Sequence, residues 1–316
     1  MIKLSIIVPV YNVEQYIEKC IRSLYNQDIP ASEYEVLCVE DCSPDQSAAI
    51  IERLQKEYPT LHLIRHEHNK KLGGARNTGL RNAQGQYIMY VDSDDMLYSN
   101  SLGLLVKEMD RLNDDYIYFN MQRLFPDNQY EPIKHHSLPN NQMTGADLFF
   151  CNIIPWEAQI SACSKIYRRD FLLRNDLFFI EGIMYEDNDY AMRVAAVATK
   201  CRYIDTTPYI YRQIPTSTTH NSDNYTRMLY WQATWPHINA LFDTIGNKDE
   251  RFVELIATYL RMDVCHVMDR IDYLPREQRI AIIKNLSFSQ WRYYLHFLPW
   301  KRRIKYINKM ITSFVA

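Results

Sequence analysis

Short apolar runs alternate with amphipathic stretches along the first 120 residues. Residues 4–10 (LSIIVPV) form a continuous apolar run of strand length, typical of a strand buried on both faces of a parallel sheet. The next stretch, 13–27, has apolar residues at helical spacing. This alternation predicts a doubly wound α/β domain, in which ligands bind at the carboxyl ends of the strands. The predicted strands are 4–10, 35–39, 61–66, 86–91 and 116–120, and the predicted helices are 13–27, 47–58, about 74–83 and about 101–112.

The pattern changes twice after residue 120. Residues 126–145 contain three prolines, one Gly and several Asn, and we interpret them as a long loop or a small antiparallel excursion. Helices and short strands mix from 146 to 212, and from about 223 the pattern is mainly helical. The expected fold is therefore α/β, with a Rossmann-like, mostly parallel central sheet flanked by helices and a mainly helical C-terminal extension.

The composition is that of an ordinary soluble globular protein, 47% hydrophobic and 23% charged. A net charge of −2 provides no field that would attract nucleic acid, so no nucleic-acid partner is expected. Seven cysteines without a CxxC pair fit reduced thiols in a cytoplasmic protein. The N-terminus is interpreted as a first strand rather than a signal peptide. No window approaches ~18 uninterrupted apolar residues, so no membrane-spanning helix is expected.

Three carboxylates fall within four positions at the end of the fourth predicted strand, in the stretch YVDSDDMLY. They could form a solvated turn whose Asp caps the next helix. A calcium loop is excluded, because its twelve-residue pattern with a central Gly and a terminal Glu is absent. The third interpretation is a divalent metal shared with nucleotide phosphates, since Mg²⁺ or Mn²⁺ is typically held by only one or two carboxylates.

A second acidic group occurs in MYEDNDY, where Glu186 and Asp187 are adjacent. This group could be the first turn of an amphipathic helix, which the helix dipole makes favourable for acidic residues. It could also supply a general base, provided that it reaches an acceptor hydroxyl on the face opposite a leaving group. Nearby, Lys165 and Arg168 could contact a phosphate or the acceptor, but the favoured interpretation is a solvated basic stretch.

Five short motifs occur in an order and spacing that resemble family 2 glycosyltransferases. They are LSIIVPVYN, VLCVEDCSPDQS, KKLGGARNTGL, YVDSDD and SKIYRRDFLLRNDLFF…GIMYEDNDYAMR, and the likeness continues through YIYRQIPTSTTH to about residue 220. The resemblance implies a GT-A fold in residues 1–222, with a nucleotide-sugar-binding half (1–120) and an acceptor-binding half (121–222). Residues 223–316 would form a separate helical C-terminal region, in which no further motif is identified.

The resemblance also assigns roles. Tyr11 would stack on a uracil base, Asp41 would accept its imide N–H, and Arg76 would contact the diphosphate. The sequence departs from the common DDGS pattern in reading EDCS, with Cys42 in place of a Gly that permits unusual backbone angles, which weakens the assignment of the nucleotide. The full set of residues implied to bind the nucleotide sugar is Pro9, Tyr11, Asn12, Glu14, Asp41, Arg76, Asn77, Asp92 and Ser93.

For the metal, Mn²⁺ or Mg²⁺, the resemblance implies Asp94 as a ligand, with Asp95 as a second candidate ligand or an acceptor contact. His220 could also bind the metal or the diphosphate, although a single His is more often structural. For catalysis it implies Asp187 as the general base of an inverting displacement, with Glu186 as a positioning residue or the next candidate. The implied reaction is transfer of one sugar from a nucleotide-diphosphate sugar, with UDP-sugars favoured, to a hydroxyl acceptor. The acceptor would be a glycan or lipid-linked glycan in the assembly of surface polysaccharide, capsule or lipopolysaccharide.

Two alternatives stay open. A non-catalytic nucleotide- or carbohydrate-binding subunit is kept open by the EDCS variation, although the DSDD and ED groups are intact. A sugar-phosphate nucleotidylyltransferase is less favoured, because its GxGTR-like glycine-rich loop is absent. No QxxRW motif occurs, so the chain does not resemble a processive polysaccharide synthase.

The end of the chain is cationic and amphipathic. After Glu277 there is no acidic residue, and eight Lys and Arg follow, so the first 277 residues carry a net charge of −10. Trp300, Ile304, Ile307, Ile311 and Phe314 fall on one helical stripe, with most of the cations off it. Such a helix either packs on its domain or contacts the cytoplasmic membrane peripherally.

Overall fold

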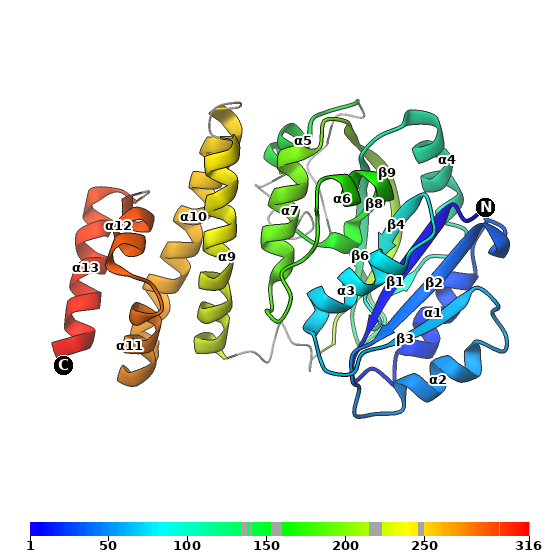
Figure 1. The fold of residues 1–316 in the computed structure, drawn as a ribbon, viewed down its shortest axis with the longest axis horizontal. Helices are drawn as coiled ribbons and strands as arrows, with labels where there is room; N and C mark the ends of the chain where they lie inside the picture. Colours follow the sequence, from blue (N-terminus) through cyan, green and yellow to red (C-terminus); the bar gives the residue numbers. More distant parts are fainter. Residues whose placement is uncertain are drawn as a thin grey trace. The chain divides into compact units, whose positions relative to one another are not determined.

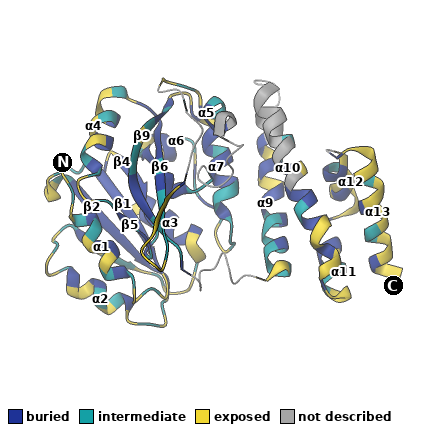
Figure 2. Cartoon of the chain, turned by 180° about the vertical axis from the view of Figure 1, so that it is seen from behind, coloured by how far each residue is buried: buried dark blue, intermediate teal, exposed yellow. Residues whose placement is uncertain are grey.

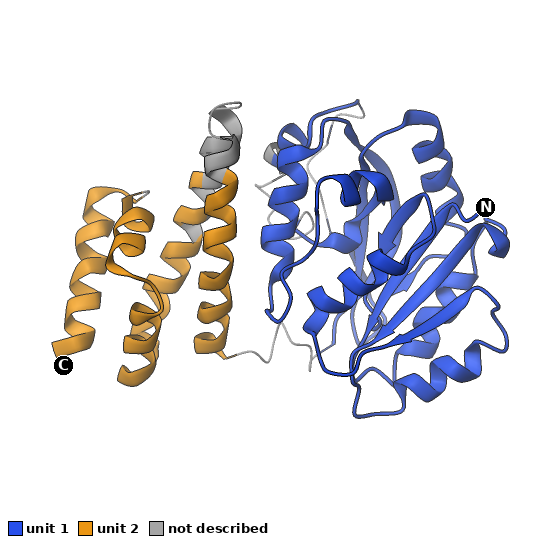
Figure 3. Ribbon diagram, in the orientation of Figure 1, with its two compact units in different colours: residues 1–215 blue, residues 216–316 orange. Residues whose placement is uncertain are grey.

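The computed structural model describes residues 1–133, 138, 141–152, 160–214, 223–245, 250–296 and 298–315. The chain divides into two compact units, which we call unit 1 (Met1–Pro215) and unit 2 (Thr216–Ala316) and describe separately (Figure 3). The sequence placed this division at residue 222. The candidate chemistry of the acidic motifs lies in unit 1.

A single mixed sheet forms the centre of the described part of unit 1 (Figure 1). Its strands follow the order β3-β2-β1-β4-β8-β6-β9-β5, and β7 pairs with β6. The strands are β1 (Leu4–Val10), β2 (Tyr34–Glu40), β3 (Leu61–Arg65), β4 (Tyr87–Tyr90), β5 (Met96–Leu97), β6 (Tyr116–Leu124), β7 (Tyr130–Pro132), β8 (Lys165–Arg168) and β9 (Cys201–Arg212).

The first four strands of the chain are parallel. In the register of β1, Ile7 lies opposite Tyr90 of β4, and Val10 lies opposite Glu40 of β2. Every residue of β1, β2 and β4 is buried, as expected for strands covered on both faces (Figure 2). The polar segments that follow these strands therefore meet at one edge of the sheet.

Helices pack around this sheet. Helix α3 lies against β1 and β2, and this close approach requires Gly79, because a Cβ there would clash with the Ile7 side chain. Helices α5 and α7 lie side by side (Figure 1). The helices of unit 1 are α1 (Ile17–Tyr25), α2 (Ser47–Leu54), α3 (Lys71–Asn82), α4 (Leu102–Leu112), α5 (Gly145–Asn152), α6 (Arg169–Arg174) and α7 (Glu186–Val197), with short 3₁₀ turns at Ala31–Glu33 and Ala162–Ser164.

The rest of the sheet is mixed. Strand β8 pairs antiparallel with both β4 and β6, while β9 runs parallel to β6 and antiparallel to β5. This arrangement brings Tyr209 of β9 close to the acidic segment after β4, although more than 100 residues separate them in the chain. The predicted α/β fold with a mainly helical C-terminal region is confirmed.

The described part of unit 2 consists of helices. Trp235, Trp291 and Tyr294 form an aromatic cluster in its interior, and the Trp291 indole N–H donates to the Ile283 carbonyl at 2.7 Å. No helix in the described ranges is long and apolar enough to cross a membrane. The helices are α9 (Asn224–Ile245), α10 (Glu250–Arg270), α11 (Arg276–Lys284), α12 (Phe288–His296) and α13 (Trp300–Val315), with a 3₁₀ turn at Ile271–Tyr273.

Candidate active site

The turn after β2 tolerates its unusual sequence. Cys42 adopts φ 61°, the left-handed region in which glycine is usually found, and Asn12 after β1 adopts φ 56°. The buried Glu40 carboxylate accepts the backbone N–H of Ser43, which closes the turn. The EDCS segment therefore keeps the backbone geometry that a Gly would favour, at the cost of some strain at Cys42.

Asp41 is held in place at the carboxyl end of β2. One of its carboxylate oxygens, Oδ1, accepts the backbone N–H of Lys70 at 2.8 Å and lies 2.7 Å from Nδ1 of His66. The other ring nitrogen of His66 lies 2.8 Å from the Thr78 hydroxyl, so the imidazole bridges Asp41 and α3. No hydrogen bond from the described residues reaches the second oxygen of Asp41, which is free to accept a donor from a ligand. Tyr11, at the end of the neighbouring β1, is 52% exposed.

Arg76 connects the two acidic motifs from its position on α3. Its guanidinium lies 2.9 Å from Asp92 and 2.9 Å from Glu186, and it also contacts Asp187. The Arg76 side chain is buried, and its guanidinium carbon lies 5.1 Å from the centre of the Phe179 ring. One guanidinium thus serves three carboxylates that are up to 111 positions away in sequence.

Glu186 and Asp187 begin α7 but differ in exposure. The Glu186 side chain is 4% exposed and the Asp187 side chain is 22% exposed. Burial, and next the charge of Asp187, raise the pKa of Glu186 to about 8, against the opposing effect of Arg76. Asp187 also accepts the backbone N–H of Ala162 at 3.3 Å. The accessible carboxylate of this pair is therefore Asp187.

The acidic segment after β4 contains carboxylates in three different environments. Asp92 faces Arg76, whereas Asp95 is buried and accepts the Tyr209 hydroxyl at 2.6 Å and the Arg212 backbone N–H at 2.8 Å. The Asp94 carboxylate forms no hydrogen bond or ion pair with any other described residue, although its own backbone N–H and the more distant charge of Arg212 favour its ionised form. Burial, and next the charge of Asp92, raise the pKa of Asp94 to about 6.

The environment of Asp94 fits a divalent cation. A carboxylate that burial and a neighbouring negative charge destabilise gains most from a positive ion, and carboxylate oxygen is a preferred ligand of Mg²⁺ and Mn²⁺. Among the described residues, no cluster of three or more His, Cys, Asp or Glu side chains is arranged to hold a metal. A cation at Asp94 would then depend on substrate phosphate oxygens and water for the rest of its coordination.

Several residues that were expected to bind the ligand instead form hydrogen bonds within the protein. Both polar atoms of the buried Asn77 amide bond to the 179–181 segment, with Nδ2 donating to the Phe179 carbonyl and Oδ1 accepting its N–H. The Glu14 carboxylate accepts the Gln46 N–H at 2.9 Å, just before α2. We therefore treat Asn77, Glu14 and the saturated Asp95 as structural residues rather than as ligand contacts.

The other expected residues are placed as follows. Pro9 is buried within β1, and Ser93 is buried beside Asp92. His220 lies outside the described residues. The interpretation of Lys165 as solvated was wrong, because its side chain is buried and its ammonium group donates to the Ser161 carbonyl at 2.9 Å. Burial lowers the pKa of Lys165 to about 7.

Sequence reasoning missed two residues that position the site, His66 and Tyr209. His66 ends the run LHLIRH, so the rule that selected the polar residues after β1, β2 and β4 would also have selected it. Tyr209 offers no comparable signal, because its role depends on the pairing of β9 with β5 beside the acidic segment.

A family model described as glycosyl transferase family 2 matches residues 5–174. The uncharacterized glycosyltransferase EpsJ of Bacillus subtilis (strain 168) is 33% identical over 219 residues, which cover 68% of this chain and 62% of EpsJ. The poly(ribitol-phosphate) beta-N-acetylglucosaminyltransferase TarS of Staphylococcus aureus (strain MW2) is 29% identical over 213 residues, which cover 67% of this chain and 35% of TarS. The chain therefore spans less than two thirds of the length of either relative.

Two solved structures share the fold. TarS residues 1–349 in complex with UDP-GlcNAc align with a TM-score of 0.60 and 23% identity, over 90% of this chain and 87% of that one. The mannosyltransferase PcManGT of Pyrobaculum calidifontis, in complex with GDP-Man and Mn²⁺, aligns with a TM-score of 0.52 and 17% identity, over 99% and 86% of the two chains. These likenesses establish a GT-A fold.

Proposed function

Because the chain belongs to glycosyl transferase family 2, we propose that it is a metal-dependent, inverting glycosyltransferase. It transfers a single sugar from a nucleotide-diphosphate sugar, preferably a UDP-sugar, to a hydroxyl acceptor. The observation that carries this proposal is the Arg76 cluster, in which one buried guanidinium contacts both Asp92 and the ED pair of α7. Through Arg76, Asp92 at the expected donor site lies close to Asp187, the carboxylate that we expect to accept a proton.

The nucleotide would bind at the ends of β1 and β2. The exposed ring of Tyr11 can stack on a base, and the second oxygen of Asp41 can accept an imide N–H such as that of uracil. His66 and the Lys70 N–H fix the Asp41 carboxylate before any ligand arrives, so little side-chain entropy is lost on binding. That UDP-GlcNAc occupies a solved TarS structure supports a UDP-sugar as the donor.

A bound Mg²⁺ or Mn²⁺ would neutralise charge on the leaving diphosphate. Asp94 would hold it, and Asp92 would face the donor from its contact with Arg76. Asp187 would accept the proton of the acceptor hydroxyl as its oxygen attacks the anomeric carbon. The bond between this carbon and the diphosphate oxygen breaks as the new bond forms, and the configuration inverts because attack is from the opposite face. The Arg76 and Ala162 contacts would hold Asp187 in position.

The acceptor is proposed from the relatives. TarS is named as acting on poly(ribitol-phosphate), which supports a teichoic acid or another cell-surface glycan, free or lipid-linked, as the acceptor class. The use of a nucleotide-sugar donor supports a cytoplasmic location for the proposed reaction.

Turnover of a panel of UDP- and GDP-sugars, with and without Mn²⁺, tests this proposal. We expect metal-dependent release of the nucleoside diphosphate from at least one donor, and loss of that release in excess chelator. A non-catalytic binding subunit would bind a donor without turnover. Undiminished activity in excess chelator would show that the reaction does not need a metal.

Helix α13 supports a membrane contact as part of this function. Its apolar stripe is exposed, from 44% at Phe314 to 65% at Trp300 (Figure 2). The opposite face is the packed one, where Tyr306 is fully buried and Lys309 pairs with Asp272 at 2.6 Å. This helix therefore packs through its polar face and presents its apolar face to solvent, the reverse of an ordinary surface helix.

We propose that this apolar stripe contacts an anionic lipid surface. Residues 278–316 carry eight positive charges and no acidic residue, so two copies of this region would repel each other, whereas anionic headgroups would be attracted. Sedimentation with vesicles containing phosphatidylglycerol should fall strongly in an Ile304→Asp/Ile311→Asp variant. Thr312→Asp, which places a charge beside the stripe, is the control and should retain most of the binding. Equal sedimentation of the wild type and the double variant would refute the contact.

A further inference from the structure

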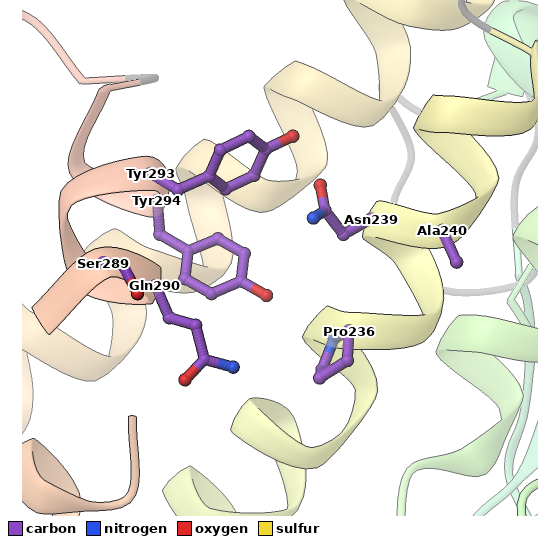
Figure 4. A pocket seen from close by; sticks show the side chains of 7 residues that line it. All are labelled: Pro236, Asn239, Ala240, Ser289, Gln290, Tyr293 and Tyr294. Atoms are coloured by element: carbon purple, nitrogen blue, oxygen red, sulfur yellow. The ribbon is translucent and has the colours of Figure 1, made fainter. Parts of the chain in front are cut away.

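Unit 2 contains a cavity of about 360 Å³ between α9 and α12 (Figure 4). This volume falls within the range of small-molecule sites. Pro236 and Asn239 of α9 form one wall, and Gln290, Tyr293 and Tyr294 of α12 form the other. None of these residues belongs to the motifs that point to sugar transfer, which end at about residue 220.

The Asn239 side chain carries a buried acceptor without a partner. Its Oδ1 atom is shielded from solvent and accepts no hydrogen bond. Figure 4 shows this amide extending from α9 toward the tyrosines of α12. A buried acceptor left unsatisfied costs about 1–3 kcal/mol, and a small rotation of the amide toward the cavity would let a ligand hydroxyl or amide N–H recover it.

Gln290 presents a donor from the opposite wall. Its Oε1 accepts the Ser287 backbone N–H at 2.8 Å and the Ser287 hydroxyl at 2.9 Å, which fixes the orientation of the amide. The NH₂ group is therefore the free end, and in Figure 4 it points toward α9. Donor and acceptor thus face the same cavity from two helices.

The aromatic wall is rigid. Tyr294 is almost completely buried, and its ring lies 4.8 Å from that of Trp235, which in turn lies 6.0 Å from that of Trp291. Burial raises the pKa of Tyr294 to about 12, so its hydroxyl stays protonated and can donate a hydrogen bond. Its ring supports that of Tyr293, 5.5 Å away, which is only half-buried and offers apolar surface without a large loss of side-chain entropy on binding.

We propose that this cavity is a second saccharide site that binds a neutral sugar unit of the acceptor glycan. No Lys, Arg, Asp or Glu lines it, so it has no group that would recognise a phosphate or another charged ligand. Tyrosine rings beside amide and hydroxyl groups match the apolar faces and multiple hydroxyls of a pyranose. The cavity itself is independent of the transfer chemistry, and only its role in holding the acceptor rests on the proposed function. A polymer held there would reach the transfer site at a raised effective concentration.

Titration of the full chain with chitotriose and with maltotriose tests this site, with the fluorescence of Trp235 and Trp291 or calorimetry as the readout. We expect at least one trisaccharide to bind, and saturating UDP with Mn²⁺ not to displace it. Asn239→Ala and Gln290→Ala should each weaken binding by about fivefold to tenfold, the loss expected for one neutral hydrogen bond. Asn308→Ala, an exposed Asn of α13, is the matched control and should bind as the wild type does.

Three results would overturn the site: no binding of either saccharide, displacement by UDP, or unchanged binding in both Asn239→Ala and Gln290→Ala. Because Gln290 is exposed, its variant remains informative if Asn239→Ala fails to fold. The titration needs no donor sugar. A chain that binds saccharide through Asn239 and Gln290 but turns over no nucleotide sugar would therefore refute the proposed function and leave the saccharide site standing.

Discussion

Two acidic segments of unit 1 have similar sequences and different surroundings. Asp92, Asp94 and Asp95 follow β4, and Glu186, Asp187 and Asp189 begin α7, so each segment holds three carboxylates in four positions. At α7 every carboxylate contacts an arginine: Arg76 serves the first two, and Arg193 lies 2.6 Å from Asp189. After β4 only Asp92 forms an ion pair with an arginine side chain, and no other described residue pairs with Asp94.

This difference in counter-charges indicates different roles for the two segments. A buried carboxylate that pairs with no other described residue, such as Asp94, gains most from an added cation. A carboxylate that an arginine holds in a fixed orientation, such as Asp187, needs no rearrangement before it meets a substrate hydroxyl. Because Arg76 contacts both segments, a change of charge at one segment alters the electrostatic environment of the other.

The largest expected effect follows from Asp187→Asn. The substitution keeps the size of the side chain and removes the base, so transfer to an acceptor should fall by ~100- to 10,000-fold. Affinity for the donor should stay within about threefold, because the base acts only on the acceptor hydroxyl. Initial rates with a donor and an acceptor glycan, compared with calorimetry of the donor alone, provide the measurement.

Glu186→Gln is the control for this prediction. The raised pKa of Glu186 means that a neutral side chain already suits this position at neutral pH. Transfer should therefore change much less than in Asp187→Asn. If Glu186→Gln abolishes transfer and Asp187→Asn does not, the roles of the two residues are exchanged.

Asp94→Asn tests the proposed metal ligand in the acidic segment after β4. Donor turnover should fall by at least ~100-fold, comparable to the loss of one strong electrostatic stabiliser. The melting temperature without ligand should not fall, because the replaced carboxylate has no partner and lies beside Asp92. Thermal unfolding and nucleotide release with Mn²⁺ measure the two effects. A large drop in melting temperature would mean that Asp94 holds the fold together.

A smaller effect concerns pH and stability. The folded-state pKa of Glu186, about 8, is above its ordinary value of 4.5, so the folded protein binds the extra proton and loses stability as pH rises from about 4.5 to about 8. Glu186→Gln removes this loss. Its stability relative to the wild type should increase by on the order of 4 kcal/mol between pH 5 and pH 8.5, since each unit of pKa difference corresponds to about 1.4 kcal/mol and about three of these units fall within this pH range. Urea denaturation at both pH values measures it, and a constant difference would contradict the burial argument.

The sequence predicted the fold well where local pattern decides it. Continuous apolar runs located β1, β2 and β4, and the rule for strand ends located Asp41 and the acidic segment after β4. The pattern could not show which polar atoms are already bonded within the protein. Asn77 and Asp95 have suitable types and positions, but partners from distant segments occupy them. Lys165 was misjudged for a similar reason, because β8 becomes an inner strand only through pairing with β4 and β6.

In the proposed site the segment after β4 binds the donor through a metal, while the start of α7 supplies the base. Calorimetric titration of UDP-GlcNAc with Mn²⁺ into the wild type, Asp94→Asn and Asp187→Asn tests it most directly. We predict that Asp94→Asn weakens donor binding by at least ~10-fold, about 1.4 kcal/mol, and that Asp187→Asn binds within about threefold of the wild type. Equal losses in the two variants, or unchanged binding in Asp94→Asn, would contradict this division.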